Sequence, residues 1–503
     1  MTSERDDSVP DLHALRRVDW RFLLPSVEVH RILVTQPMRG RYGPGLEVEG
    51  VEVGEIAGGA DVDGASADAV ASHPDPIVVG ELVRRRPDLP IYVELGPRQI
   101  VDPRWWMLLR RHPGTCFLAL PNHERRRAFV PVDDRRALGW SIASKGGLAA
   151  SCARIGWADS APVRATVAKV APARAVLLAP TPALHSIGAW VEGEGLLGAG
   201  ERGPASHILV TPRFSTSRHV VVLAGRDDPE VVVKTTRLAG SGVDHEVAAL
   251  RALWAATRGR DVGAPRVLKH ATWGRRRILA ETAVAGTPVT AASAAQHPEA
   301  IATEVTSWIL GLPRGGMTGG AERLSTLLDG PLARLAAAGG PAEEQLVEAT
   351  RGAVMHLAER ELPAVFEHGD VSAPNILRTG GGLALIDWEL SQAEGLPAHD
   401  LFIALGFVAR SSSNLDGSRA LVHAFLGAPP GWVHAQLRRY QRALDLPAEV
   451  LPSMFVCCWA RVAAAHAERA AVGGLDLAWW RSQPASMLWR TAIERPALLS
   501  WMG

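Results

Sequence analysis

The sequence predicts two architectures in one chain, an α/β region followed by an α+β region. Between Val29 and Pro180, short apolar runs such as "VHRILVT" and "PIYVELG" alternate with helix-like stretches, a pattern typical of a mostly parallel sheet covered on both faces. After residue 204, "HVVVLAG" and "EVVVK" flank the polar segment "RDDPE" and predict an antiparallel hairpin. From Ala291 onward the apolar spacing is mainly helical.

The size and composition of the chain indicate a globular protein of several domains. At 503 residues it is too long for one ordinary core, so we expect roughly two or three domains. It is 47% hydrophobic and 21% charged, and its formal net charge of +1 does not favour nucleic-acid binding driven by bulk charge. The N-terminus lacks the apolar run of a signal peptide, and no window approaches about 18 uninterrupted apolar residues. We therefore expect no nucleic-acid or membrane partner and a cytoplasmic location, while the oligomeric state stays open.

Residues 1–190 are predicted to form the α/β domain, followed by a linker at 191–204. In "DPRWWMLLRRH" Asp102 can cap a helix and Pro103 fits its first position. The turn after "RILV" is "TQPMRGRYGPG", which contains glycines but no G-x-G-x-x-G pattern for binding phosphate. The region is weakly similar to a Rossmann-like, methyltransferase-like domain in degenerate form, with recognition or scaffolding as its expected role. An active methyltransferase is the alternative.

Residues 205–289 contain the antiparallel strands, which carry one lysine, and a helix that carries a glutamate. Lys234 ends the strand "EVVVK" and is one of four lysines in a chain that otherwise uses arginine. Glu246 lies twelve residues later, early in the helix "GVDHEVAALRALWAAT". A compact ammonium suits contact with phosphate, and a neighbouring carboxylate can orient it. A solvated strand lysine and an exposed helix glutamate are the alternatives.

Residues 290–503 are predicted to be helical, interrupted by the segment "FEHGDVSAPNILRTGGGLALIDWEL". Asp370, Asn375 and Asp387 lie in this segment beside strand-like runs. A phosphoryl-transfer site needs a carboxylate that positions the attacking hydroxyl, together with hard oxygen ligands for Mg²⁺. Asp370 can fill the first role, and Asn375 with Asp387 the second. A capped turn is the alternative explanation of Asp370 and Asn375.

The motifs "HGDVSAPNIL", "LALIDWEL" and "PAHDLFIAL", in this order, resemble the aminoglycoside phosphotransferase / choline kinase family. The resemblance covers about three fifths of the chain, from Ser206 onward. It implies a bilobal protein-kinase-like fold, with a small antiparallel-sheet lobe and hinge at 205–289 and a large helical lobe at 290–503. It also implies that Asp370 is the catalytic base or hydroxyl-orienting carboxylate.

The same resemblance implies roles for the other candidate residues. Asn375 and Asp387 would bind Mg²⁺, and Lys234 would contact the α- and β-phosphates of ATP, or of GTP as the alternative, with Glu246 as its partner. His368 and Asp400 would support the loop around Asp370. The segment "AETAV", with Glu281 and Ala283, would be the hinge that reads the adenine through backbone groups.

One segment departs from the family pattern. The loop expected to cover the phosphates is "TPRFSTSRHVVV", which has no glycine, whereas relatives often use glycine to bring backbone N–H groups close to phosphate. The candidates to donate hydrogen bonds in place of glycine are Ser215, Thr216 and Ser217.

The sequence thus predicts an ATP- and Mg²⁺-dependent phosphotransferase whose acceptor is a hydroxyl of a small molecule or natural-product intermediate. From Leu390 onward there are eight Asp or Glu and ten Arg, a balance that does not favour a polycationic aminoglycoside and leaves a neutral or anionic acceptor open. Two alternatives remain: a kinase of Ser or Thr in a biosynthetic peptide, and a non-catalytic, nucleotide-binding pseudo-kinase scaffold.

Overall fold

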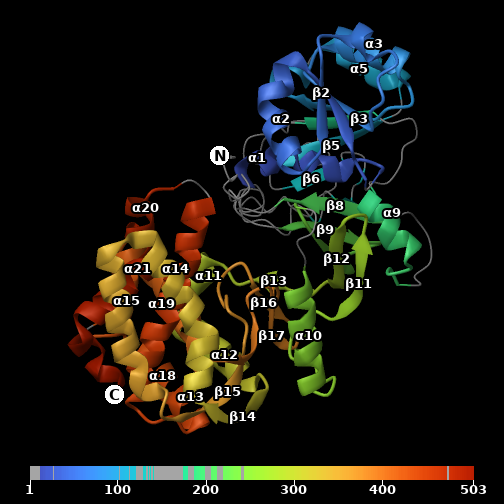
Figure 1. The fold of residues 1–503 in the computed structure, drawn as a ribbon. Helices are drawn as coiled ribbons and strands as arrows, with labels where there is room; N and C mark the ends of the chain where they lie inside the picture. The colour runs from blue at the N-terminus through green and yellow to red at the C-terminus, as the bar shows by residue number, and fades with distance from the viewer. Residues whose placement is uncertain are drawn as a thin grey trace. The chain divides into compact units, whose positions relative to one another are not determined.

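The computed structural model describes residues 12–503 apart from 27, 101, 113, 121–127, 132–133, 135, 138–139, 141–173, 179–185, 199–204, 212–218, 239–242, 427 and 473–474. The chain forms two compact units (Figure 1). Unit 1 consists of Met1–Asp244 and Val267–Ala283, and unit 2 of His245–Arg266 and Val284–Gly503.

The first four strands of unit 1 are parallel and adjacent, in the order β4-β3-β1-β2. Their bounds are β1 Arg31–Thr35, β2 Glu52–Ile56, β3 Ala69–Ser72 and β4 Ile91–Leu95. Helices connect or flank them: α1 Leu12–Arg17, α2 Arg39–Val48, α3 Pro76–Arg85, α4 Pro97–Ile100 and α5 Pro103–Arg111, with 3-10 turns at Asp19–Leu23 (η1), Gln36–Met38 (η2) and Gly59–Val62 (η3). The predicted cap is confirmed, because the Asp102 side chain accepts a hydrogen bond from Arg104 N–H at the start of α5.

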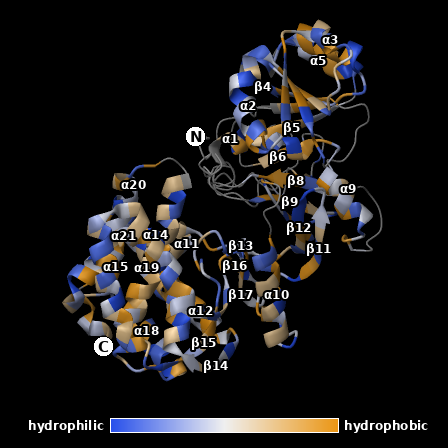
Figure 2. Ribbon diagram, in the orientation of Figure 1, coloured by the Kyte–Doolittle hydropathy of each residue, from blue (hydrophilic) through white to orange (hydrophobic). Residues whose placement is uncertain are grey.

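Both faces of this sheet are covered, as the sequence predicted. On one face Trp105 of α5 and Val79 of α3 pack against strand residues such as Val93. On the other face Tyr42 of α2 and Trp20 of η1 pack against Tyr92, and the Trp20 and Tyr92 rings are stacked with centroids 4.3 Å apart. Figure 2 shows hydrophobic colouring along the strands beside α3 and α5.

The sheet continues beyond the parallel strands as antiparallel strands, so the predicted degenerate Rossmann-like domain is not confirmed. The full order is β11-β12-β10-β9-β8-β6-β5-β7-β4-β3-β1-β2. The added strands are β5 Gly114–Leu120, β6 Ala128–Pro131, β7 Arg174–Leu178, β8 Ser206–Val210, β9 His219–Gly225, β10 Val231–Thr236, β11 Val267–Trp273 and β12 Arg276–Thr282. The predicted hairpin is confirmed: β9 and β10 are antiparallel, with Ala224 opposite Val231.

Strand β8 joins the two parts of the sheet that the sequence analysis assigned to different domains. Phe129 of β6 lies opposite Leu209 of β8, and β8 pairs along its length with β9. One apolar cluster on a single face includes Trp20, Phe117 and Val222. Unit 1 thus includes described residues on both sides of the predicted linker. Of that linker, residues 191–193 belong to α9 (Ser186–Gly193) and 199–204 lie outside the described residues.

Unit 2 is mainly helical and contains two small sheets. Its helices are α10 Asp244–Ala256, which begins at the last residue of a unit 1 segment, α11 Ala291–Gln296, α12 Pro298–Gly311, α13 Gly320–Leu324, α14 Gly330–Gly339, α15 Pro341–Val354, α16 His399–Ser412, α17 Gly417–Phe425, α18 Gly431–Leu444, α19 Val450–Val472, α20 Leu477–Ser482 and α21 Pro484–Glu494, with short turns at Ser325–Asp329 (η4), Met355–Leu357 (η5) and Pro496–Met502 (η6). The sheets are β13-β16-β17 (Thr287–Pro288, Ile376–Thr379, Gly382–Leu385) and β14-β15-β18 (Arg314–Gly319, Glu361–Glu367, Gln392–Gly395).

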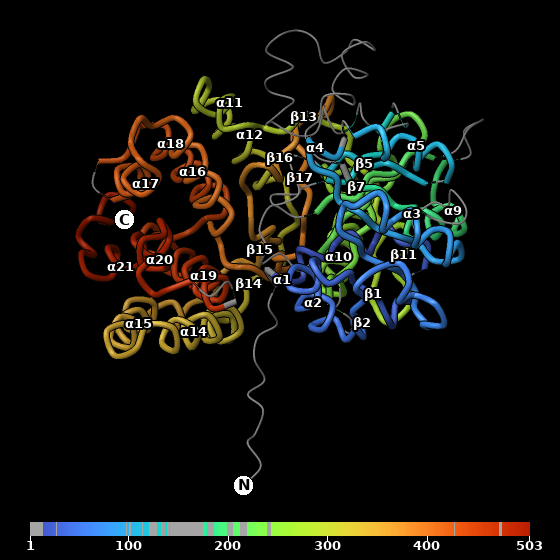
Figure 3. Tube along the Cα trace, turned by 90° about the horizontal axis from the view of Figure 1, so that it is seen from above, coloured from blue at the N-terminus to red at the C-terminus, as the bar shows by residue number. Residues whose placement is uncertain are grey.

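Helix α19 forms the centre of unit 2. Figure 3 shows it beside α14 and α15, and it also packs against α21 and α16. Within the described part of the chain, Val450–Ala471 is long and apolar enough to cross a membrane, but 72% of that window is buried inside the protein, as in a core helix. The nearby tryptophans Trp459, Trp480 and Trp489 are buried, which makes them core residues.

Candidate active site

The loop that carries Asp370 follows strand β15 directly and is held through its backbone. The Asp400 carboxylate, at the start of α16, accepts hydrogen bonds from His368 N–H at 2.7 Å and Gly369 N–H at 2.8 Å. Gly369 has φ of 89°, and a Cβ there would lie 2.6 Å from the Leu390 carbonyl oxygen. Only glycine fits this position without displacing the backbone.

The imidazole of His368 links the loop to the strand that precedes Asp387. Asp370 N–H lies 3.2 Å from His368 Nδ1, and His368 Nε2 lies 3.1 Å from the carbonyl oxygen of Ile386. Nδ1 must therefore accept and Nε2 donate, which assigns the neutral tautomer with its proton on Nε2. The Trp388 ring packs edge-on against the imidazole, with centroids 4.6 Å apart. His368 thus holds the two chemistry-bearing segments in register.

Both carboxylate oxygens of Asp370 receive hydrogen bonds from the same loop. Ser372 Oγ donates to Oδ1 at 2.7 Å, and Asn375 Nδ2 donates to Oδ2 at 3.1 Å. Burial raises the pKa of Asp370 and the charges of Asp387 and Glu389 add to the rise, against the hydrogen bond from Ser372 and the charge of Arg469. A carboxylate with a raised pKa is the better proton acceptor.

The β16–β17 hairpin brings Asn375 and Asp387 to the same place. Ile376 lies opposite Leu385, and Ile386 N–H donates to the carbonyl oxygen of Asn375 at 3.1 Å. The next residue, Asp387, has φ of 71°, in the left-handed region that is uncommon for residues other than glycine. The segment "RTGGG" connects these two strands. The described residues contain no group of three or more His, Cys, Asp or Glu arranged around a metal site, so an ion at Asn375 and Asp387 would need ligands from phosphate or water.

Glu246 contacts the backbone next to Asp387, within unit 2. It is buried on α10, and its Oε1 accepts a hydrogen bond from Trp388 N–H at 2.9 Å, which fixes the backbone directly after Asp387. The sequence analysis predicted Glu246 as the partner of Lys234. Lys234 belongs to unit 1, and this pairing stays a prediction.

Lys234 lies near the end of β10, between β9 and β12, and its side chain is 8% exposed. Its Nζ is 3.3 Å from Oε1 of Glu281 on β12, which is 2% exposed. The sequence analysis assigned Glu281 to the hinge through its backbone, and the structure adds an ion pair through its side chain. Lys234 is opposite Leu279, so Glu281, two residues on, points to the same face.

The remaining predicted residues of the nucleotide site are Ala283, Ser215, Thr216 and Ser217. Ala283 N–H donates to the carbonyl oxygen of Glu230 at 2.8 Å, so this N–H already has an acceptor within unit 1. The adenine-reading role of Ala283 stays a prediction. Ser215, Thr216 and Ser217 lie outside the described residues.

A buried ion cluster behind the Asp370 loop was missed by the sequence analysis. Glu367, the last residue of β15, pairs with Arg461 of α19 through two bonds of 2.5 and 2.9 Å and lies 3.5 Å from His399 Nε2. Burial raises and Arg461 lowers the pKa of Glu367, with a net lowering. Burial and Glu367 raise the pKa of Asp400 to about 7. The sequence contained one signal for this cluster: Glu367 ends the apolar run "PAVFE". A carboxylate in such a buried position is rare unless it is paired, so a cationic partner could have been expected.

Comparison with known proteins supports the predicted resemblance. Residues 215–445 match the model of the phosphotransferase enzyme family. No curated protein matches the chain significantly. The family match supports a kinase-like fold in this part of the chain, where the β9, β10 and β12 strands, Lys234 and the H-G-D loop occur in the expected order.

Several solved structures of kinases are also similar. An aminoglycoside phosphotransferase, APH(3'')-Id from Streptomyces rimosus, is 16% identical over 55% of this chain and 91% of its own, with a TM-score of 0.32. A choline/ethanolamine kinase family protein from Mesorhizobium loti is 17% identical over 59% and 94%, with a TM-score of 0.36. Choline kinase LicA from Streptococcus pneumoniae is 12% identical over 57% and 90%, with a TM-score of 0.35.

Proposed function

We propose that this protein transfers the γ-phosphate of ATP to a hydroxyl group of a small molecule, in a reaction that requires Mg²⁺. The observation that carries the proposal is the convergence of Asp370, Asn375 and Asp387 on the H-G-D loop and the β16–β17 hairpin. These residues lie inside the segment that matches the phosphotransferase enzyme family.

Each residue has a distinct part in the proposed reaction. Asp370 orients the acceptor hydroxyl and takes its proton, a task to which its raised pKa and part-buried position are suited. Asn375 and Asp387 would hold Mg²⁺, which supplies neutralisation of the phosphate charge when bound. Lys234 contacts the phosphates from the sheet, and Glu281 keeps its ammonium in place.

The test separates catalysis from nucleotide binding. Asp370→Asn preserves shape but removes the proton acceptor, so turnover should fall by about 10³-fold while the affinity for Mg·ADP, measured by calorimetry, stays unchanged. Asp387→Ala should abolish Mg²⁺-dependent nucleotide binding. Asp445→Asn, an exposed aspartate after α18, is the matched control and should behave as wild type. Near wild-type turnover of Asp370→Asn would refute the assignment, and nucleotide binding without turnover on any acceptor would favour a scaffold.

Two arginines near Asp370 bear on the class of acceptor. Arg410 lies in the last turn of α16, and burial lowers its pKa against the opposing effect of the Asp370 charge. Arg469 of α19 acts on Asp370 itself. Burial, Arg469 and Arg410 together lower the pKa of His466 to about 4. Helices α16 and α19 thus place two cationic residues near Asp370, beside the acidic Asp387 and Glu389, and these cations favour a neutral or anionic acceptor over a polycationic one.

A panel of hydroxyl compounds of similar size tests this preference. An amino sugar, a neutral sugar and a sugar carboxylate should give kcat/KM values that rise in that order. Arg410→Gln should reduce the preference for the carboxylate by about tenfold. A faster rate with the amino sugar, unaffected by Arg410→Gln, would contradict the proposed acceptor class, and transfer to Ser or Thr of a peptide alone would favour the peptide-kinase alternative.

A further inference from the structure

A buried ion network ties the N-terminal segment to the strand that carries Lys234. Arg237 lies one residue beyond the end of β10 and three residues after Lys234. Its guanidinium pairs with Asp19 of η1 at 2.7 Å, and both side chains are fully buried. A buried charge is tolerated only with a well-placed partner, so Arg237 depends on Asp19.

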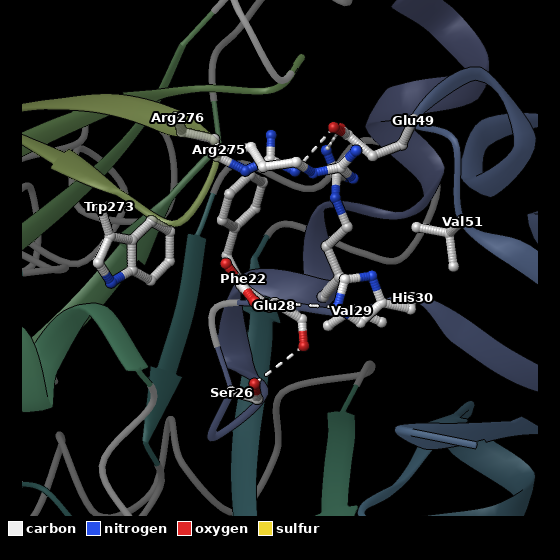
Figure 4. A pocket seen from close by; sticks show the side chains of 11 residues that line it. Phe22, Ser26, Glu28, Val29, His30, Glu49, Val51, Trp273, Arg275 and Arg276 are labelled. Atoms are coloured by element: carbon white, nitrogen blue, oxygen red, sulfur yellow. Dashed lines mark hydrogen bonds and ion pairs between the residues drawn. The ribbon is translucent and has the colours of Figure 1, made fainter. Parts of the chain in front are cut away.

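The backbone of Arg237 is also held by hydrogen bonds. Its carbonyl oxygen accepts hydrogen bonds from Arg21 at 2.6 Å and from Arg276, at the start of β12, at 3.0 Å. Glu49, which follows α2, neutralises both guanidinium groups at 2.5 and 2.8 Å. Figure 4 shows Arg276 and Glu49 pointing toward one another at a pocket also lined by Phe22 and Trp273.

The network joins residues from two distant parts of the chain. Arg237 and Arg276 lie inside the family match at 215–445, whereas Asp19, Arg21 and Glu49 come from about 200 residues earlier in the chain. The carboxylates that neutralise the far end of β10 are therefore supplied from outside the matched segment.

This position couples the network to Lys234 mechanically. A strand rises about 3.3 Å per residue, which puts Arg237 about 10 Å from Lys234 along one extended segment. β10 is hydrogen-bonded to β9 on one side and β12 on the other, and Arg276 of the network belongs to β12, the strand that also presents Glu281 to Lys234. A shift at Arg237 or Arg276 would therefore move both members of the Lys234–Glu281 pair.

We infer that Asp19 and Glu49 are positioning residues for the phosphate-contacting lysine, and that the N-terminal region thereby completes the nucleotide-binding sheet. The inference rests on the proposed function, in which Lys234 contacts the nucleotide. It gives the N-terminal region a role in nucleotide binding without any chemistry of its own.

Glu49→Gln tests the inference, because it keeps the shape of the side chain and removes its charge. Glu94→Gln is the matched control: Glu94 is likewise buried and paired with an arginine, Arg41, at 2.7 Å, but it lies on β4, six strands away from β10 in the sheet. Glu49→Gln should raise the KM for ATP by about three- to tenfold with little change in the KM for the acceptor, and Glu94→Gln should leave both unchanged. Arg276→Lys, which keeps the charge but loses the forked geometry, should give a smaller rise and serves if Glu49→Gln does not fold.

Hydrogen–deuterium exchange provides a readout that does not depend on nucleotide. Glu49→Gln should speed amide exchange in the peptide covering Val231–Thr236, and Glu94→Gln should not. Equal effects of the two variants on exchange and on the KM for ATP would overturn the inference by assigning the network a purely structural role, and so would no change in Glu49→Gln. If Glu49→Gln speeds exchange in this peptide but the wild-type protein binds no Mg·ATP, the positioning of β10 is upheld and the proposed function is refuted instead.

Discussion

The two units secure their candidate functional residues by buried ions in different ways. In unit 1 the ion network around Arg237 fixes the end of strand β10, and its carboxylates, Asp19 and Glu49, come from the distant N-terminal segment. In unit 2 Glu367 immediately precedes the loop that it stabilises, and its partner Arg461 comes from a helix about 90 residues later. The carboxylates that hold the strand are distant from it in sequence, whereas the carboxylate of Glu367 directly precedes the loop.

This difference shows what each kind of element needs. A strand already has hydrogen bonds on both sides, so only its lengthwise position is left to fix, and unit 1 fixes it at the Arg237 carbonyl. A loop lacks such a ladder, so unit 2 supplies acceptors for its N–H groups through Asp400 and surrounds that carboxylate with Glu367 and Arg461. Tests of these clusters can break or sharpen the comparison.

The largest effect is expected from Glu367→Gln. It leaves the guanidinium of Arg461 buried without its carboxylate, which should lower the free energy of unfolding by about 3–5 kcal/mol in thermal or urea unfolding. The double variant Glu367→Gln/Arg461→Met removes the charge pair together and should recover most of that loss. If the single variant is as stable as wild type, the cluster does not anchor the loop.

A smaller, pH-dependent effect is expected from Asp400→Asn. The pKa of Asp400 is raised from 3.8 to about 7, chiefly by burial and then by Glu367, so its protonated form favours the folded state. Its contribution is fully present below pH 3.8 and is lost as the pH rises to about 7. The stability of wild type relative to Asp400→Asn should therefore fall by about 3–4 kcal/mol over this range. A difference that does not vary with pH would contradict the shifted pKa.

The smallest effect is expected at Glu343, a buried carboxylate of unit 2 that pairs with two arginines, Arg481 and Arg490. Arg481 and Arg490 are 39% and 25% exposed, so solvent screens the ion pair that each forms with Glu343. Arg481→Gln should change the free energy of unfolding by about 1 kcal/mol or less, because Arg490 still neutralises Glu343. A loss as large as that of Glu367→Gln would show that exposure of the arginines does not decide the outcome.

The sequence predicted those features of the fold that depend on interactions between residues close together in the chain. The hairpin between Asn375 and Asp387, the β9–β10 hairpin and the Asp102 cap each depend on residues within a short span. The H-G-D motif marked its loop, although Asp400, 32 residues after His368, holds it. The ion pair of Lys234 with Glu281 could not be predicted, because it depends on the register between β10 and β12. The continuous sheet was missed for a similar reason: "SHILV" reads as a strand, but nothing in it specifies which strands flank it.

Strand β8 has a practical consequence for anyone who wishes to study the kinase-like part alone. A polypeptide started at residue 205 would keep β8 but lose β6, and would present an open row of N–H and C=O groups on a largely apolar strand. Such an edge recruits other strands, so the shortened chain should self-associate in solution rather than behave as an independent catalytic module.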